Sequence, residues 1–414
     1  MSNLYNTVRD QIAAGGDPGG SEPKGGPSAW ISAAVVLGLA GWSAVAAPWV
    51  LVFVVGLLVS VFLHEMGHYL TSKWTGMKVT QFFMGFGPRL WSRQRGEVEY
   101  GVRAFPLGAY VRVVGMNNLD DCAPEDEPRA YRSKSYPRKM LVICAGSLVQ
   151  FLLAFALFTG IFSLAGVPGE TGTVTFAKVV PLVGGGESAA MRAGLRDGDV
   201  VVSVDGVAVT TRSEVSRAID AAKPGDTMEL VVERDGETLV VVPTLSGVGD
   251  RAYLGVVMES YGWVPTGPVE ALGEAAAEVV TTAARSARGV FTVFNPVNLV
   301  SNVTADVADP QTRPSTVVGA TQVGGRMGES QGLRGVLLLL ASVNVVFATL
   351  NLFPLLPFDG GHAAIATYER IRSRKGRTYH ADAAKMSTLA VVTMVAMLAV
   401  FAVGLYLDIT QPFG

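Results

Sequence analysis

Two histidines four residues apart, with a glutamate between them, are the residues best suited to chemistry in this chain. In the segment HEMGH, His64 and His68 share one face of a helix, because residues at i and i+4 are neighbours on its surface. This spacing suits two ligands of a tetrahedral zinc ion. The carboxylate of Glu65 could then take a proton from a water activated by the metal. The motif predicts metal-assisted hydrolysis, although iron or cobalt would accept the same ligands.

A third protein ligand is needed for a catalytic zinc site, which keeps one position open. The segment NLFPLLPFDGGH interrupts a later apolar stretch, and its two prolines and paired glycines predict a broken helix. Broken backbone at membrane depth is tolerated only where it lines protein or a watery cavity. Asp359 is therefore the expected third ligand. His362 is the competitor, three residues nearer the water, while His380 lies in a basic loop and is expected to be a bystander.

Four long uncharged stretches must position these residues. They cover residues 25–63, 140–169, 335–358 and 386–407, and each exceeds the roughly 20 residues that cross a bilayer. The first is about twice as long as one span needs, and Pro48 predicts two spans, about 29–47 and 49–70; one long kinked helix is the alternative. Asn344 is expected to make a helix–helix hydrogen bond.

Composition agrees with a membrane protein and excludes several other classes. Charged residues are 16% of the 414 residues, and the mean hydropathy is +0.36. The net charge of −2 gives no electrostatic indication of a nucleic-acid partner. Two cysteines are too few for a disulfide framework or a cysteine zinc site.

Loop charge predicts the orientation of the spans. Residues 71–139 carry 12 Lys or Arg, and the segment ERIRSRKGR after the broken helix carries five more. The positive-inside rule places both in the cytoplasm and residues 170–332 outside it. The second basic segment also matches the pattern of a nucleic-acid-binding patch. Because it lies between two spans, we attribute its charge to membrane orientation and to contact with lipid headgroups.

At HEMGH and NLFPLLPFDGG the chain resembles the site-2 protease family of intramembrane zinc metalloproteases, most closely its PDZ-containing actinobacterial members. The resemblance covers most of the chain beyond residue 48. It implies that His64, His68 and Asp359 hold Zn²⁺ and that Glu65 is the catalytic base. It also implies that Asn351 holds substrate backbone or the developing oxyanion.

Within residues 79–116, residues 89–93 and 98–105 bracket the segment QRGE and are expected to form a hairpin. The family has a membrane-re-entrant β-loop here, with a G-x-G segment that meets substrate. The resemblance therefore implies substrate binding by Gly85, Phe86 and Gly87. An exposed strand edge could hold an unwound substrate as an added strand. An ordinary interfacial hairpin is the alternative.

The segment AAMRAGLRDGDVVVSVDGVAV, residues 189–209, resembles a bacterial protease PDZ domain. PDZ domains bind peptides by strand addition, so a substrate filter is implied; a spacer that binds nothing is the alternative.

Residues 268–294 have apolar positions at helical spacing and predict an amphipathic helix at the outer interface.

The sequence therefore predicts an α-helical polytopic membrane protein with four or five transmembrane helices, a cytoplasmic re-entrant β-hairpin and one extracytoplasmic α+β PDZ domain. The expected order is a disordered tail (1–28), helices with HExxH (29–70), the β-loop (71–139), a span (140–168), the PDZ domain (170–260), an amphipathic helix and loop (261–332), a span with the third ligand (333–362), a basic loop (363–385) and a last span (386–408).

The expected function is intramembrane cleavage of single-pass membrane proteins such as anti-sigma factors, within or near their span. The protein is expected in the cell (plasma) membrane, with its active site near the cytoplasmic side and no nucleic-acid partner. A non-catalytic PDZ scaffold is one alternative, which the presence of Glu65 beside both histidines and Asp359 disfavours. A metal transporter is another, but it would need more ionisable residues across the spans.

Overall fold

The computed structural model describes residues 27–116, 122–182, 185–373, 379–381 and 383–413. The expected disordered tail therefore lies almost entirely outside the described residues. The chain divides into two compact units, one formed by Met1–Phe158 with Ala275–Gly414 and the other by Thr159–Glu274. Each unit has its own buried core.

Long apolar helices dominate the first unit. Among the described residues, four helices are long and apolar enough to cross a membrane: Pro48–Trp74 in α3, Tyr136–Ala165 in α4, Val317–Asn351 in α9 and Thr388–Thr410 within α11 (Ala383–Thr410). The first apolar stretch is broken at Ala47, so α2 (Pro27–Ala46) and α3 are separate helices, as Pro48 predicts. The apolar part described for α2, Trp30–Ala46, is shorter than the four spans.

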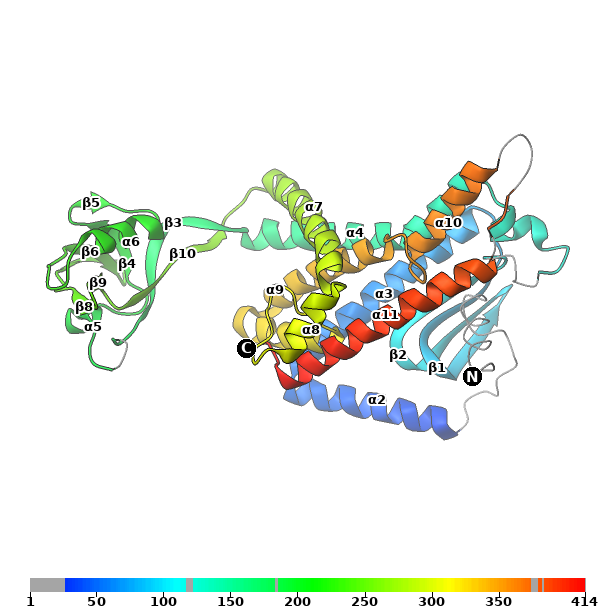
Figure 1. Ribbon diagram of the computed structural model, residues 1–414, viewed down its shortest axis with the longest axis horizontal. Coiled ribbons are helices and arrows are strands. Elements are labelled where there is room, and N and C mark those ends of the chain that lie inside the picture. The colour runs from blue at the N-terminus through cyan, green and yellow to red at the C-terminus, as the bar shows by residue number, and fades with distance from the viewer. Residues whose placement is uncertain (1–26, 117–121, 183–184, 374–378, 382, 414) are drawn as a thin grey trace. The chain divides into compact units, whose positions relative to one another are not determined.

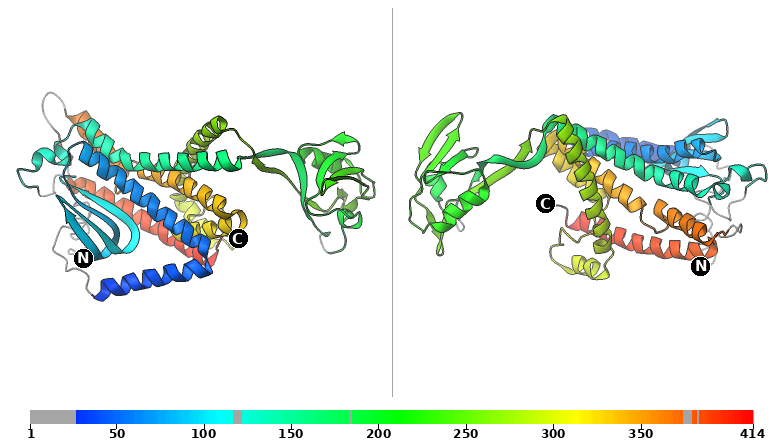
Figure 2. Two further views of the ribbon diagram at one scale, coloured as in Figure 1. Left: turned by 180° about the vertical axis from the view of Figure 1, so that it is seen from behind. Right: turned by 90° about the horizontal axis from the view of Figure 1, so that it is seen from above.

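Helices α3 and α9 pack against each other through a small apolar core. Phe53 and Leu57 of α3 meet Val336 and Leu340 of α9. The Asn344 side-chain amide donates to Ser60 Oγ on α3 at 2.9 Å, which confirms the expected helix–helix hydrogen bond. Figure 1 and Figure 2 show the two helices side by side.

Helix α9 begins 16 residues before the predicted span, at Val317 rather than at residue 333. The segment GATQVGGRMG, residues 319–328, falls in the expected loop and contains four glycines, which are poor helix formers. Tertiary packing overrides this propensity. Side chains of α3 occupy the space that a Cβ would take, with Phe53 against Gly324 and Trp49 against Gly328. The helix kinks at Gly332, whose φ is +63°.

The start of α9 is held by a carboxylate from the end of α11. Asp408 is fully buried and accepts hydrogen bonds from the backbone N–H groups of Thr316 and Gly319, at 2.7 and 3.0 Å. Arg313 donates to the same carboxylate at 3.1 Å. These donors satisfy a charge that would otherwise be costly to bury.

Strands β1 (Val79–Arg95) and β2 (Val98–Val113) form the expected hairpin around QRGE, but both are longer than the predicted strands at 89–93 and 98–105. The hairpin is folded back on itself, because Gln81 pairs with both Arg112 and Glu99, and Met84 with both Ala109 and Val102. Its apolar face packs against α3, α4 and helix α10 (Asp359–Arg372) in a shared core. Two 3-10 helices, Glu127–Arg129 and Tyr131–Ser133, lead into α4.

Two further helices come before α9 along the chain, and α10 comes directly after it. Helix α7 (Pro268–Val293) confirms the amphipathic helix expected at 268–294, and α8 (Pro296–Thr304) follows it. Residues 352–358 separate α9 from α10, as the two prolines predict. Residues 363–372 were expected to be loop and instead continue α10.

The second unit is an α+β fold. Its main sheet has the order β10-β3-β4-β6-β7, with β5 beside β4, and β8 and β9 form a separate hairpin. The elements are β3 (Val167–Val179), α5 (Ala189–Arg192), β4 (Val200–Val204), β5 (Val207–Ala208), α6 (Arg212–Ala221), β6 (Leu230–Arg234), β7 (Glu237–Val241), β8 (Ser246–Val248), β9 (Arg251–Tyr253) and β10 (Val256–Val264). A capping box of Thr211 and Glu214 starts α6.

A buried ion pair ties this sheet to the loop before β4. Asp199 is fully buried and accepts from Arg234 Nε and Nη2 at 2.6 and 2.7 Å and from the Arg196 backbone N–H at 2.9 Å. Burial alone would raise the pKa of Asp199, but the hydrogen bonds from Arg234 and Arg196 outweigh it and lower that pKa. The carboxylate thus stabilises the fold in its ionised form.

We expect Asp199→Asn to destabilise the second unit by about 2–4 kcal/mol, because Arg234 would lose its charged partner. A lowered folded-state pKa means that this stabilisation is complete above the unfolded value of about 4 and is lost as pH falls through the folded value. Hydrogen exchange of β4 and β6 amides in the full chain measures the loss. Asp250→Asn, an exposed loop change in the same unit, is the control. Equal protection in both variants at neutral pH would contradict the prediction.

Candidate metal centre

Helix α3 presents both histidines of the motif on one face. The Nε2 atoms of His64 and His68 lie 3.1 Å apart, and the two rings meet edge to face with centroids 4.8 Å apart. His64 is 8% exposed, so the pair lies inside the helical unit. The i, i+4 spacing therefore has the outcome that the sequence predicts.

Asp359 reaches the same point from a distant part of the chain. It is the first residue of α10, directly after the break that ends α9. Its Oδ2 atom lies 3.4 Å from His64 Nε2 and 3.3 Å from His68 Nε2. Because α9 ends before this residue, the chain can turn and direct the Asp359 carboxylate toward the face of α3 that carries the two histidines.

The three atoms have the spacing of ligands around a tetrahedral ion. Ligands at about 2.05 Å from zinc lie about 3.3 Å from each other in a tetrahedron. The three measured separations are 3.1, 3.3 and 3.4 Å. Asp359 Oδ2 is also buried without a hydrogen-bond partner among the described residues, which leaves it a lone pair for a metal. The donor set fits Zn²⁺.

Helix α4 holds the outer nitrogens of the two histidines. Gln150 Oε1 lies 3.2 Å from His64 Nδ1, and the Val142 carbonyl oxygen lies 2.8 Å from His68 Nδ1. If each Nδ1 carries the proton and donates it, each Nε2 is left with its lone pair. Gly146 lets α4 approach this closely, because a Cβ there would lie 2.4 Å from His68 Nε2.

Gln150 was not anticipated from the sequence. A polar amide within a candidate membrane span, Tyr136–Ala165, is the signal that could have indicated it. Such groups are costly in an apolar setting unless they have a partner. Gln150 is only 2% exposed.

Glu65 lies beside the three candidate ligands. The ionisable groups that act on its carboxylate are His68, His64 and Asp359, and the backbone of Val111 on β2 lies next to it. A carboxylate here neighbours both the metal-binding atoms and the hairpin. The arrangement permits proton transfer to or from a group bound at the centre.

The remaining predicted residues lie in the segment before Asp359 and in the hairpin. Asn351 is the last residue of α9, just before the break that precedes Asp359. Gly85, Phe86 and Gly87 form a bend in β1, where both glycines have positive φ and Phe86 is 47% exposed. A Cβ at Gly85 would lie 2.7 Å from the Phe105 carbonyl oxygen, so the strand can bend this tightly only with glycine.

The two other histidines are outside the group. Among the described residues, the ligand atoms that converge are those of His64, His68 and Asp359. His362 lies in the first turn of α10, and His380 Nδ1 lies 3.9 Å from Glu369.

Comparisons with known proteins agree with this chemistry. The family model described as "Peptidase family M50" matches residues 52–398 of this chain. "Zinc metalloprotease Rip1" of Mycobacterium bovis is 34% identical over 365 residues, covering 78% of this chain and 86% of that protein. The protein of that name from Mycolicibacterium smegmatis is 32% identical over 355 residues, with the same coverage. A putative zinc metalloprotease of Rhizobium meliloti is 30% identical over 387 residues, covering 86% of this chain and 94% of that protein.

Apolar helices long enough to span a bilayer and a cluster that fits zinc define a membrane zinc metalloprotease. The chain belongs to peptidase family M50, the site-2 proteases, and is similar to the actinobacterial Rip1 proteins.

Proposed function

We propose that this protein cuts single-pass membrane proteins, such as anti-sigma factors, within or near their transmembrane segment. The observation that supports this most is the convergence of His64, His68 and Asp359 between helices of membrane-spanning length. Peptide bonds in a bilayer are shielded from water, so a protease acting there needs a site enclosed by its own helices.

In this proposal His64 Nε2, His68 Nε2 and Asp359 Oδ2 hold the zinc ion. When bound, zinc supplies Lewis-acid polarisation of the scissile carbonyl and lowers the pKa of water. Glu65 takes a proton from the attacking water and returns it to the leaving nitrogen. The Asn351 side-chain amide donates to the oxyanion that develops on the carbonyl.

Gln150 would position His64 within this ligand set. We expect Gln150→Leu to weaken zinc binding by about 10–100-fold, because the His64 ring loses the partner that fixes its orientation. Zinc affinity, measured by competition with a chelating dye, tests this directly. Ser147→Ala removes another buried polar group from the same helix and is expected to leave the affinity unchanged. Equal affinities in wild type and Gln150→Leu would remove Gln150 from the site.

The hairpin is proposed to hold the substrate in an extended form beside the centre. Its shared core with α3 and α4 anchors it next to the metal-binding helix, and Phe86 is exposed at the Gly85–Phe86–Gly87 bend. Helical substrate must unwind before its peptide bonds become accessible, and pairing with a strand edge favours the extended form. We propose that this bend meets the substrate.

We propose that the protein lies in the plasma membrane with the hairpin on the cytoplasmic side and the second unit on the opposite side. The positive charge of residues 71–139 and of the segment ERIRSRKGR supports this orientation.

We propose that the second unit, approximately residues 170–260, is a PDZ domain that binds peptide. A groove of about 330 Å³ lies between α6 and β9–β10 and includes Ile219, Leu254 and Met258. Apolar side chains beside a strand are the features that strand addition uses.

Two measurements test these proposals separately. Purified protein reconstituted with a tagged single-pass substrate should release fragments whose ends map within or beside the substrate's span by mass spectrometry. Cuts confined to its soluble segments would contradict the proposed function.

For the second unit, Ile219→Lys should abolish binding of a fluorescent peptide to the full chain, whereas Val207→Lys, at an exposed site on β5, should not. Equal binding in both variants would contradict the PDZ proposal.

A further inference from the structure

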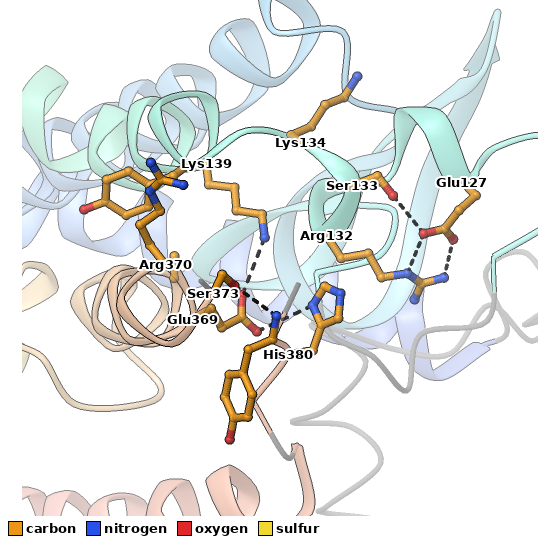
Figure 3. A pocket seen from close by; sticks show the side chains of 12 residues that line it. Glu127, Arg132, Ser133, Lys134, Lys139, Glu369, Arg370, Ser373 and His380 are labelled. Atoms are coloured by element: carbon orange, nitrogen blue, oxygen red, sulfur yellow. Dashed lines mark hydrogen bonds and ion pairs between the residues drawn. The ribbon is translucent and has the colours of Figure 1, made fainter. Parts of the chain in front are cut away.

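The surroundings of α11 differ between its two ends. Before its start, charged side chains pair with one another, as Figure 3 shows. Arg132 donates to the carboxylate of Glu127, and Lys139 Nζ lies 3.5 Å from Glu369 Oε2. Beside the other end of α11 lies α8, whose sequence PVNLVSNVT contains no ionisable side chain. This helix has no part in the proposed hydrolysis.

The side of α8 that faces the protein is polar. Asn302 is buried, and its side-chain amide donates to Thr312 Oγ1 at 3.0 Å while its Oδ1 accepts from the Asp309 backbone N–H at 2.9 Å. One turn earlier, the Asn298 side-chain amide donates to the Thr292 carbonyl oxygen, at the end of α7, at 2.9 Å. Hydrogen bonds from asparagine side chains therefore hold this side of α8 in place.

The outward side of α8 is apolar. Val297, Val300 and Val303 are 72%, 63% and 41% exposed. At 3.6 residues per turn, these three side chains fall within an arc of about 120° around the helix. A helix that faces water has the reverse arrangement, with its apolar side chains inward and its polar ones outward. The exposed valines therefore indicate that this side of α8 faces an apolar environment.

The exposed hydroxyl groups of α8 fit the same environment. Ser301 Oγ donates to the Asn298 carbonyl oxygen at 3.1 Å, and Thr304 Oγ1 donates to the Val300 carbonyl oxygen at 3.0 Å. Both donors are thus satisfied within the helix and do not need water as an acceptor.

The end of α11 gives the depth of α8. The span Thr388–Thr410 has 23 residues. At 1.5 Å per residue this is about 34 Å, which matches the roughly 30 Å hydrocarbon core of a bilayer. Gln411 therefore lies at a membrane surface. Its Oε1 accepts from the Ala308 backbone N–H, and its carbonyl oxygen accepts from Arg313, both at 2.7 Å. These bonds hold the segment that follows α8 at the level of that surface.

We propose that α8 docks on the lipid bilayer, with Val297, Val300 and Val303 among the acyl chains just below the headgroups. The leaflet is the one at the C-terminal end of α11. An uncharged helix with a valine face buries apolar area there without placing a charge in hydrocarbon. The docked helix holds the chain between α7 and α9 against the membrane. This inference goes beyond the proposed proteolysis and does not depend on it.

The test measures the depth of α8 in the full-length protein reconstituted in phosphatidylcholine nanodiscs. A background with Cys122→Ser and Cys144→Ser, checked for retained zinc, carries one nitroxide label at Val300→Cys. Val207→Cys on β5 is the matched aqueous reference, since this valine is similarly exposed in the second unit. Val395→Cys, exposed within the span of α11, is the lipid reference. Electron paramagnetic resonance compares label accessibility to oxygen, which concentrates in lipid, with accessibility to a water-soluble nickel chelate.

We expect the oxygen-to-chelate accessibility ratio at Val300→Cys to be several-fold higher than at Val207→Cys and to approach that at Val395→Cys. A ratio equal to that at Val207→Cys would show that α8 faces water and would overturn the proposal. Low accessibility to both reagents would show that protein, such as a second copy of the chain, covers the valines, and this would overturn it as well.

Discussion

Replacing Glu65 by Gln is expected to abolish proteolysis while leaving zinc bound. Gln keeps the size of the side chain but cannot accept and return a proton, so the loss should be about 10²–10⁴-fold. Glu65 lies beside His64, His68 and Asp359 and is not one of the three converging ligands. Fragment release from a reconstituted single-pass substrate and zinc content per chain measure the two properties.

The control for this variant is Glu329→Gln, an exposed residue of α9 that changes the charge equally. It should cleave at the wild-type rate. Wild-type cleavage by Glu65→Gln would remove Glu65 from the mechanism. Loss of zinc from this variant would instead show that Glu65 holds the metal and would contradict its proposed role as a base.

Replacing Asp359 by Ala is expected to remove zinc and activity together. Two imidazoles remain, and a catalytic zinc site requires three protein ligands. The loss of zinc affinity should exceed the roughly 100-fold that outer partners of ligands cost. Zinc content after dialysis, measured by atomic emission, reports the result.

His362→Ala is the matched comparison, because His362 lies on the same helix one turn from Asp359 and was the competing ligand. The convergence of Asp359 with the α3 histidines predicts that this variant keeps its zinc. Retention of zinc by Asp359→Ala together with its loss from His362→Ala would exchange the two assignments.

Much of the centre could be predicted because its determinants are local. The i, i+4 spacing of His64 and His68 fixes a shared helical face wherever α3 lies. The prolines before Asp359 required a break, and the structure has one between α9 and α10. Pro48 divides the first apolar stretch for the same reason.

Other features depend on contacts between distant segments and could not be predicted from local pattern. Gln150 acquires its role only because Gly146 lets α4 approach α3. The first half of α9 has a glycine-rich sequence, and it is helical because α3 side chains fill the space over Gly324 and Gly328. The buried carboxylate of Asp408, which holds the start of α9, likewise comes from the far end of the chain.

A structure of the zinc-bound protein tests the central claim most directly. The predicted result is a single ion within 2.0–2.2 Å of His64 Nε2, His68 Nε2 and an Asp359 carboxylate oxygen, with a fourth position open beside Glu65. An ion held by other residues, or Asp359 outside bonding distance of an ion on the two histidines, would contradict it.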